Sequence, residues 1–360
     1  MSGTGTEDGL ARVEAARLEA FCSAILSACG ADDATAAAAS RAMMHASRLG
    51  IDSHGVRLLE HYATGLVGGR LNPRPELRFR QGAGATATLE ADNAHGARAT
   101  YAAMERAVDI ARTFGLGAVA IKDSSHFGAA GAYALAAAER GLVGFATCNS
   151  DSFVRLHGGA ERFHGTNPLA FAVPVEGERP WLLDMATSSI PYNRVKLYES
   201  LGIELPPGVA SDASGEDTIR PEEVEMLAPL GGAFGFKGAG LAGVAEIFSA
   251  VLTGMGLSFE LAPMPGPDFS TPRRLGAFVL AIDPIRFVDE ATFRSGMRRY
   301  LDALRTGRTR AGGVVMAPGD REWAEADRRA HDGIPIDPAT RDAFDRLADR
   351  FGIAPPVGGG

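Results

Sequence analysis

The stretch GAVAIKDSSHFGAAGAYALAAAERGLVGFATC (117–148) carries the strongest indication of fold class in this sequence. Two apolar runs, GAVAIK (117–122) and LVGFATC (142–148), lie on either side of a small-residue segment with helical spacing. A strand, a helix and a second strand at this spacing predict a βαβ unit that contains a parallel pair of strands. We therefore expect an α/β protein.

The segments around this unit continue the same pattern. Further strands are predicted at ATATLEAD (85–92), LAFAVPV (169–175), WLLDMA (181–186) and GAFVLAID (276–283). A long amphipathic helix is predicted over residues 96–115. The alanine-rich segment GAGLAGVAEIFSAVLTGMG (238–256) is predicted to be a buried helix.

Both ends of the chain are predicted to be helical, which suggests three parts. Residues 1–75 form an N-terminal helical segment with helices predicted over 10–30, 32–50 and 54–69. Residues 76–285 form the central α/β domain. Residues 286–356 hold three polar helices, which we expect to pack back on the N-terminal helices.

Composition excludes several classes of function. The 360 residues carry a formal net charge of −8 without a compensating basic block, which argues against a nucleic-acid partner. The three cysteines form no CxxC pair and no HExxH motif is present, so we expect no catalytic metal. No signal peptide and no membrane-spanning run is recognisable, which predicts a cytoplasmic protein that does not bind a membrane.

Two histidines lie where chemistry is expected. His54, in the motif SHG, follows Ser53 at the start of a predicted helix, where the positive end of the helix dipole favours a neutral imidazole. His126 follows a strand's carboxyl end, the usual position of sites in α/β folds. Asp184 also ends an apolar strand and could orient an imidazole. Each residue has an alternative explanation in structure alone, as a helix cap.

The nucleotide-binding signature G-x-G-x-x-G does not follow any predicted strand. The segment GFKGAG (235–240) begins a predicted helix and places Lys237 beside backbone N–H groups, which is a plausible anion site. A glycine-rich helix start is, however, more often a packing device.

Taken in order, several motifs resemble one family. GIDSHGV (50–56), SSHFGAAGAYALAAAERGLVGFATCNS (124–150), GTNPLAFAVP (165–174), LLDMATS (182–188) and MAPGDRE (316–322) resemble the malate/L-lactate dehydrogenase family, which is unrelated to the classical Rossmann lactate and malate dehydrogenases. The resemblance covers residues 10 to 350. It implies a homodimer, a non-Rossmann cofactor-binding sheet flanked by helices from both ends of the chain, and NAD or NADP as cofactor.

The resemblance also implies roles for individual residues. His54 would exchange the proton while hydride moves between nicotinamide and substrate, Ser53 and Asp184 would assist it, and His126 is the alternative proton acceptor. Asn167, in GTNP, would support the substrate site. The cofactor positions of the family fall on Asp184, Met185, Ala186, Thr187, Ser188, Lys237, Gly238, Gly319, Asp320 and Arg321.

The sequence departs from the family near the substrate. The arginine usually found four residues after the SHG histidine is Leu58 here, and Arg57 stands one position early, a rotation of about 100° on a helix. Arg155 and His157 occupy a loop that is usually apolar, and Arg155 could be a relocated carboxylate clamp or a surface arginine.

Three functions remain open from the sequence. The first is an NAD(P)-dependent oxidoreductase acting on a small 2-oxo or 2-hydroxy acid. The second is a reductase of a cyclic imine 2-carboxylate, which needs the same hydride geometry. The third is a family member that has lost turnover, which Leu58 favours and the retained Ser53, His54, His126, Asp184 and Lys237 disfavour.

Overall fold

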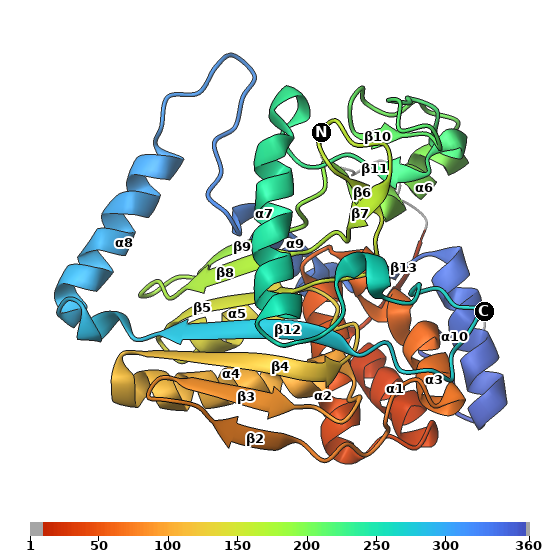
Figure 1. The fold of residues 1–360 in the computed structure, drawn as a ribbon, viewed down its shortest axis with the longest axis horizontal. Coiled ribbons are helices and arrows are strands. Elements are labelled where there is room, and N and C mark those ends of the chain that lie inside the picture. Colours follow the sequence, from red (N-terminus) through yellow and green to blue (C-terminus); the bar gives the residue numbers. More distant parts are fainter. Residues whose placement is uncertain (1–9, 358–360) are drawn as a thin grey trace.

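The computed structural model describes residues 10–357 and shows an α/β protein built on a mixed seven-stranded sheet (Figure 1). The strand order is β2-β3-β4-β12-β5-β8-β9. The bounds are Arg78–Gln81 for β2, Thr86–Glu90 for β3, Leu116–Ser124 for β4, Leu275–Ile282 for β12, Val143–Cys148 for β5, Leu169–Val173 for β8 and Trp181–Met185 for β9. Every strand predicted in the centre of the chain is present.

The predicted pairing of the βαβ unit is wrong in one respect. Strands β4 and β5 run in the same direction, but β12 lies between them and is antiparallel to both. Within this sheet, the hydrogen-bonded parallel pair is β3 with β4. A strand about 130 residues downstream can enter this position because pairing order is set by long-range contacts, which local periodicity does not encode.

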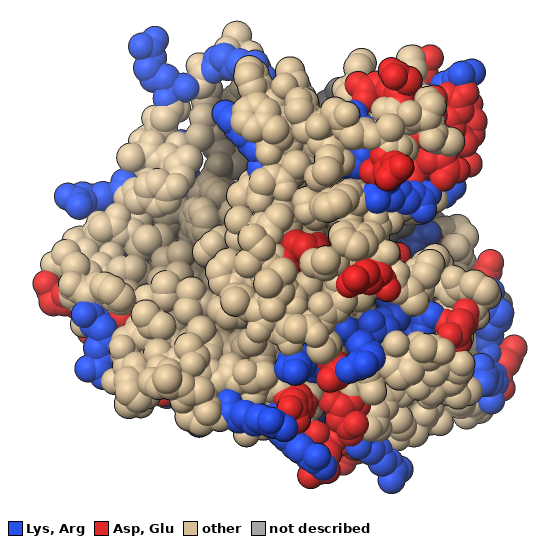
Figure 2. Space-filling view, in the orientation of Figure 1, with Lys and Arg blue, Asp and Glu red and all other residues tan. Residues whose placement is uncertain are grey.

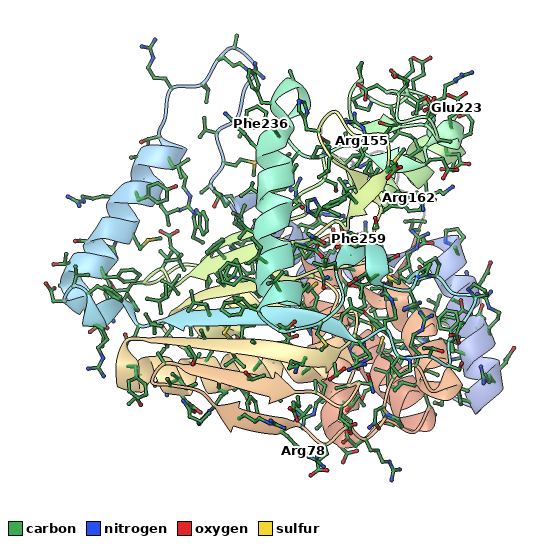
Figure 3. The ribbon with its side chains drawn as sticks, in the orientation of Figure 1. Arg78, Arg155, Arg162, Glu223, Phe236 and Phe259 are labelled. Atoms are coloured by element: carbon green, nitrogen blue, oxygen red, sulfur yellow. The ribbon has the colours of Figure 1, made fainter. Side chains whose placement is uncertain are left out.

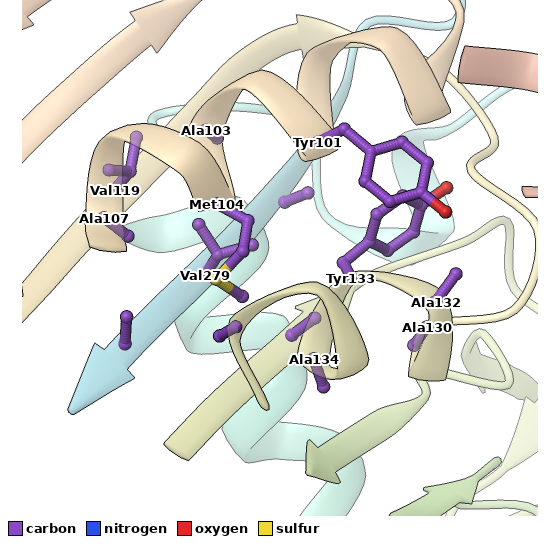
Figure 4. Packing of buried hydrophobic residues seen from close by; sticks show 14 of the residues in the cluster. Tyr101, Ala103, Met104, Ala107, Val119, Ala130, Ala132, Tyr133, Ala134 and Val279 are labelled. Atoms are coloured by element: carbon purple, nitrogen blue, oxygen red, sulfur yellow. The ribbon is translucent and has the colours of Figure 1, made fainter. Parts of the chain in front are cut away.

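Two helices, α4 (Gly96–Phe114) and α5 (Gly131–Ala138), cover one face of the sheet. Their alanines pack against Val119 and Val279, and the rings of Tyr101 and Tyr133 meet edge to face with centroids 4.8 Å apart (Figure 4). Helix α5 can approach β5 closely because residue 144 is a glycine. An added Cβ at Gly144 would lie 2.2 Å from the carbonyl oxygen of Ala134.

The opposite face of the sheet is covered mainly by α7 (Phe236–Glu246) and the π-helical turn that continues it (Ile247–Val251). The prediction of a buried helix is only half right. Ala242 and Ala245 are buried, whereas Ile247 is 53% and Val251 61% exposed. The helix therefore presents an apolar side to the exterior, because a single layer cannot bury both sides of an apolar helix.

Helices from both ends of the chain pack together beside the sheet. The bounds are Ala15–Ala28 for α1, Asp33–Arg48 for α2, Leu59–Gly68 for α3, Asp320–Asp332 for α9 and Pro338–Phe351 for α10. Helix α10 contacts α1 and α3, and α9 contacts α2. Strand β1 (Ala11–Val13) pairs with β13 (Ile334–Ile336), and both join the same apolar core.

The third N-terminal helix begins later than predicted. Residues Asp52–His54 and Val56–Leu58 form two short 3₁₀ turns, and α3 begins only at Leu59. The extended backbone of Gly55 separates the two turns. His54 therefore lies in a 3₁₀ turn and not in the first turn of an α-helix.

Helix α8 (Glu290–Arg305) does not follow the rest of the C-terminal segment back to the N-terminal helices. It projects from the end of β12, and Leu301 is its only buried residue. Its arginines form ion pairs with the turn between β8 and β9, with Arg305 Nη1 2.7 Å from Glu178. None of the helices within residues 10–357 is long and apolar enough to cross a membrane.

A smaller four-stranded sheet stands beside the large one, in the order β10-β11-β6-β7. Its strands are Ala210–Ser211, Met226–Leu227, Val154–Arg155 and Arg162–His164, and helix α6 (Tyr192–Leu201) packs nearby. This sheet holds the loop in which the sequence departs from its family.

The close approach of α5 to β5 can be tested with one alanine. Gly144→Ala should lower the free energy of unfolding by about 1–3 kcal/mol, because the new methyl group overlaps a helix carbonyl. The matched control is Gly296→Ala in α8, where nothing lies within 4 Å of the added Cβ and helix propensity favours alanine by roughly 0.5–1 kcal/mol. Urea unfolding of both variants measures the difference, and equal midpoints would contradict the packing described.

Candidate active site

The motif SHG is fixed by a close approach to α2. A Cβ on Gly55 would lie 2.2 Å from Ser47 Oγ, so no larger residue fits without displacing the turn. Ser47 Oγ also accepts a hydrogen bond from the backbone N–H of Val56, at 3.0 Å. The glycine after His54 is therefore needed to place the histidine.

The turn is also bound to the C-terminal part of the chain. Arg329 of α9 places its guanidinium against Asp52, with Nη1–Oδ1 and Nη2–Oδ2 distances of 2.5 and 2.9 Å. Its Nη1 donates in addition to the carbonyl oxygen of Ser47, at 2.6 Å. The side chain of Arg329 is only 2% exposed. The Asp52 side chain is 46% exposed, so the buried partner of this bidentate pair is the guanidinium, which would lose its carboxylate if Asp52 were removed.

The structure brings His54 and His126 together. Their rings stack with centroids 5.8 Å apart and an angle of 24° between the planes. A hydroxyl engages Nδ1 of each ring: Ser53 Oγ lies 2.8 Å from Nδ1 of His54, and the Tyr62 hydroxyl lies 2.8 Å from Nδ1 of His126. Nε2 of each ring has no hydrogen-bond partner among residues 10–357 and remains available to a substrate.

Both imidazoles are expected to be neutral at neutral pH. Burial lowers the pKa of His54. Burial also lowers the pKa of His126 well below its usual value, and a positive charge on His54 or His61 would lower it further. From the sequence we expected a helix dipole to keep His54 neutral, but in the structure burial is what lowers the pKa of His54. A neutral imidazole can accept the proton of an alcohol.

Asp184 ends β9 and points to the start of α5. Its Oδ2 accepts a hydrogen bond from the backbone N–H of Gly131, at 2.8 Å. Burial raises the pKa of Asp184 to about 6, although the Gly131 hydrogen bond opposes this shift. In the described part of the chain no hydrogen bond joins Asp184 to either imidazole, so the structure places it beside the helix that follows His126 and not on the histidines.

The predicted cofactor segments meet around the end of β9. Thr187 Oγ1 donates to the carbonyl oxygens of Thr166 and Asn167, each at 3.1 Å. The backbone N–H of Leu230 donates to the carbonyl oxygen of Thr187, at 2.9 Å. The segments 165–168, 184–190 and 228–238 are therefore neighbours in space, with Met185, Ala186 and Ser188 lying in the middle one.

The glycine-rich segment leads into α7. Gly238 is buried, and its Cβ would lie 2.1 Å from the carbonyl oxygen of Leu230, so this glycine is needed for packing. Lys237 is exposed, with Nζ 5.4 Å from the centre of the Phe234 ring. Lysine at the first turn of a helix is a suitable anion-binding arrangement.

The segment with Gly319, Asp320 and Arg321 reaches the same region from the other side. The backbone N–H of Leu182 in β9 donates to the carbonyl oxygen of Pro318, at 3.2 Å. Asp320 is paired with Arg305, whose hydrogen bond lowers the pKa of Asp320, and the side chain of Arg321 is exposed beside Glu322. Of these residues Arg321 retains the most freedom to meet a ligand.

The predicted substrate residues do not converge. Arg57 is exposed. Arg155 is buried and donates to Ser211 Oγ at 2.5 Å and to Asp217 Oδ1 at 2.6 Å, which ties it to the small sheet (Figure 3). His157 is exposed, with its ring 6.0 Å from that of Phe236 at the start of α7. The arrangement favours a structural role for Arg155.

Asn167 is completely buried in a polar network centred on Glu246 of α7. Glu246 accepts hydrogen bonds from Asn167 Nδ2 at 2.8 Å and from the backbone N–H and hydroxyl of Ser258, both at 2.6 Å. Asn149 Nδ2 donates to the same carboxylate at 3.3 Å. The side-chain amide of Asn167 is therefore engaged by this buried network, which gives Asn167 a structural role in supporting the site.

Sequence reasoning missed three aromatic neighbours of the histidine pair. Tyr62 is 2% exposed and binds His126, His95 packs edge to face on Tyr62 with centroids 4.2 Å apart, and His61 packs on Phe269. The sequence signal that could have found two of them is the pair His61–Tyr62, which lies in α3 shortly after SHG. Burial lowers the pKa of His61 to about 4. In residues 10–357 no group of three His, Cys, Asp or Glu is arranged to hold a metal ion.

Several known proteins are similar to this chain. The family model described as malate/L-lactate dehydrogenase matches residues 13–345. The chain is 32% identical over 355 residues to a malate dehydrogenase of Pyrococcus abyssi, covering 96% of this chain and 97% of the relative. It is 33% identical over 302 residues to an NAD⁺-dependent ureidoglycolate dehydrogenase of Escherichia coli O157:H7, covering 84% and 85%.

Relatives with other chemistry and solved structures are also similar. A Δ1-pyrroline-2-carboxylate/Δ1-piperideine-2-carboxylate reductase of Pseudomonas putida is 30% identical over 328 residues, covering 90% of this chain and 93% of the relative. The solved structure of a malate dehydrogenase from Pyrococcus horikoshii OT3 superposes with a TM-score of 0.90 at 28% identity, covering 99% and 100% of the two chains. The predictions of family and of a non-Rossmann fold are confirmed.

The raised pKa of Asp184 gives a testable pH dependence. The folded protein binds this proton more tightly than the unfolded chain, so the contribution of Asp184 to stability is full below about pH 4 and declines as the pH rises to about 6. Asp184→Asn removes this decline, so the free energy of unfolding of wild type relative to the variant should fall by at most about 3 kcal/mol over that window.

Urea unfolding between pH 4 and pH 7 measures this difference. Asp345→Asn, on the exposed face of α10, is the control and should leave the relative stability flat. A wild-type-minus-Asp184→Asn difference that does not change with pH would show that the carboxylate is not held in a buried environment.

Proposed function

The chain belongs to the malate/L-lactate dehydrogenase family, and on that basis we propose that it is an NAD(P)-dependent oxidoreductase interconverting a 2-oxo acid and a 2-hydroxy acid. The observation that carries the proposal is the pair of stacked imidazoles, His54 and His126, each engaged through Nδ1 by a hydroxyl. Two neutral rings with free Nε2 atoms suit proton exchange with an alcohol or carbonyl oxygen.

His54 is the better proton acceptor and donor of the two. Burial is the only cause that lowers the pKa of His54, whereas protonation of His126 is also opposed by Arg273 and by any positive charge on His54, His61 or His95. Acid–base catalysis is most effective when the pKa lies near the working pH, which favours the less perturbed ring. Ser53 holds His54 in orientation through Nδ1, and Tyr62 does the same for His126.

The residues around β9 fit a nicotinamide dinucleotide. The diphosphate of such a cofactor suits Lys237 and the backbone N–H groups at the start of α7. The segment 184–190 begins at Asp184, at the end of β9. Thr187 in this segment is hydrogen-bonded to Leu230, which precedes α7. When bound, the cofactor supplies or accepts the hydride. The exposed Arg321 would suit a 2′-phosphate, but either NAD or NADP remains compatible with the site.

A specific observation keeps the imine reductase as the second candidate. The P. putida relative is named for reduction of cyclic imine carboxylates, and a C=N bond beside a carboxylate presents the same geometry to His54 as a C=O bond does. A chain that binds cofactor without turnover is the third candidate.

We also infer a homodimer, because the outer side of α7 and its π-helical turn is apolar. Ile247, Val251 and Leu252 are each more than half exposed. Figure 2 shows that few charged side chains lie over the centre of this face. Extended apolar surface of this kind supports a protein partner, here a second copy. The three free cysteines support a reducing, cytoplasmic location.

The catalytic proposal is tested by absorbance with the purified protein. NADH and NADPH are each combined with a panel of 2-oxo acids and cyclic imine carboxylates, and oxidation at 340 nm is followed. His54→Gln should lower kcat by roughly 10²–10⁴-fold, the range for loss of a general acid or base. His331→Gln, on the exposed surface of α9, is the control.

For oxidation of the alcohol, the lowered pKa of His54 predicts that kcat/KM falls only at pH values below the range in which imidazoles usually titrate. His126→Gln should have the smaller effect of the two variants. The roles would be exchanged if His126→Gln abolished turnover and His54→Gln did not. Turnover on imines alone would favour the second candidate.

The dimer is tested by light scattering after chromatography. Val251→Glu places a charge in the apolar side of α7 and should yield a monomer, whereas Val67→Glu, an exposed site on α3, should not. A wild-type monomer, or a Val251→Glu variant that stays dimeric, would contradict the proposed interface.

A further inference from the structure

A buried arginine lies close to the histidine pair and is not part of any predicted site. The side chain of Arg273 is 2% exposed. Its Nε donates to the carbonyl oxygen of Ala262 at 2.8 Å, and its Nη2 pairs with Asp151 Oδ1. Its Nη1 is buried and has no hydrogen-bond partner within residues 10–357.

The sheet register fixes where Arg273 lies. In β12, Leu275 is opposite Ser124 of β4, and Ala277 is opposite Cys148 of β5. Because β12 is antiparallel to both neighbours, the residues just before it lie beside the residues just after β4 and β5. Those residues are His126 on one side and Asp151 on the other, so Arg273 stands between the histidine pair and Asp151.

The charge of Arg273 acts on the histidines. After burial, it is the largest contribution lowering the pKa of His61, and it also lowers the pKa of His126. The nearby Asp151 is its one acidic partner among the described ion pairs, and Asp151 Oδ2 is occupied by the backbone N–H of Met264 at 3.2 Å. A second buried arginine, Arg70, uses Nη1 on the carbonyl oxygen of Met264 at 3.0 Å.

A purely structural arginine would use its donors. Guanidinium N–H groups that are buried without an acceptor are costly, so such groups are uncommon in folded proteins and call for an explanation. An anion that enters beside His54 and His126 would supply the acceptor. Of the arginines that the sequence suggested, Arg57 is exposed and Arg155 is held by Asp217. Arg70 also has a buried nitrogen without a partner, Nε, but both of its terminal nitrogens donate to backbone carbonyl oxygens, those of Met264 and Asp268.

We propose that Arg273 binds the carboxylate of the substrate through Nη1, in place of the arginine that Leu58 replaces. The carboxylate would then lie against β12, with the adjacent carbonyl carbon directed to His54 and His126. The inference rests on the proposed function, since it assumes a substrate with a carboxylate next to the reacting carbon. Carboxylate binding is thereby assigned to Arg273, in the segment between α7 and β12.

The test compares Arg273→Met and Arg273→Lys with Arg274→Met. Arg274 is the neighbouring residue, but its side chain is 64% exposed and pairs with Asp123, away from the histidines. Each protein is assayed with the best 2-oxo acid of the panel and with its methyl ester, and thermal unfolding checks that each is folded. Oxalate binding by calorimetry provides a measurement that needs no turnover.

Arg273→Met should raise KM for the acid by about 10- to 100-fold, from loss of a charge-assisted hydrogen bond, with a much smaller effect on the ester. Oxalate affinity should fall by a similar factor, and Arg274→Met should match wild type. Arg273→Lys keeps a charge opposite Asp151 and should show a smaller loss with the same preference. It supplies the comparison if Arg273→Met does not fold.

Equal losses for acid and ester would overturn the proposal, because they would reveal a structural role. Unchanged oxalate affinity in Arg273→Met, or no oxalate binding by wild type, would overturn it as well. Failure of wild type to oxidise NADH or NADPH with any 2-oxo acid would instead refute the proposed function, and the oxalate measurement would still decide the role of Arg273.

Discussion

The antiparallel insertion of β12 between β4 and β5 sets where the functional segments meet. It brings the beginning of one strand next to the ends of two others, so the residues before β12 share an edge with those after β4 and β5. His126, Asp151 and Arg273 are neighbours for this reason. A sheet in which β4 and β5 paired directly would exclude Arg273 from this edge and would leave the histidines without a nearby fixed positive charge.

Two contacts centred on carboxylates support opposite sides of the site. On the proton-transfer side, Asp52 and Arg329 hold the SHG turn against α2 and α9. On the cofactor side, Glu246 gathers Asn149, Asn167 and Ser258 beneath the turn that follows β9. Each contact binds segments that are far apart in sequence. The geometry of the site therefore depends on the packing of the whole chain and not on its motifs alone.

The sequence predicts local structure well here and long-range arrangement poorly. Periodicity located the central strands and nearly all helices, and the ordered motifs identified the family. The motifs also drew attention to His54 and His126, which the structure brings together. The sequence did not predict β12 in the middle of the sheet, since strand order depends on contacts over more than 100 residues. It also missed the 3₁₀ turns at residues 52–58, because Gly55 is dictated by Ser47 on another helix.

The same limit applies to charge. Arg155 attracted attention because its loop is unusual, yet Asp217, 62 residues away, engages it. Arg273 lies in a segment without a recognisable motif and is notable only for an unpaired buried nitrogen, which no sequence pattern reveals. Helix α8 reads as an ordinary polar helix, and its separation from the N-terminal helices follows from ion pairs to the β8–β9 turn.

The contact between Arg329 and Asp52 has a consequence for the order in which the protein acquires its site. His54, which would exchange the proton, is synthesised early, whereas Arg329, which holds the turn of His54 through Asp52, is synthesised more than 270 residues later. A chain interrupted or cleaved before α9 would contain the SHG motif, the other motifs up to residue 188 and the glycine-rich segment that leads into α7. It would still lack Arg329, which holds the turn that places His54. The site therefore becomes competent only after α9 has been synthesised, well after its catalytic motifs.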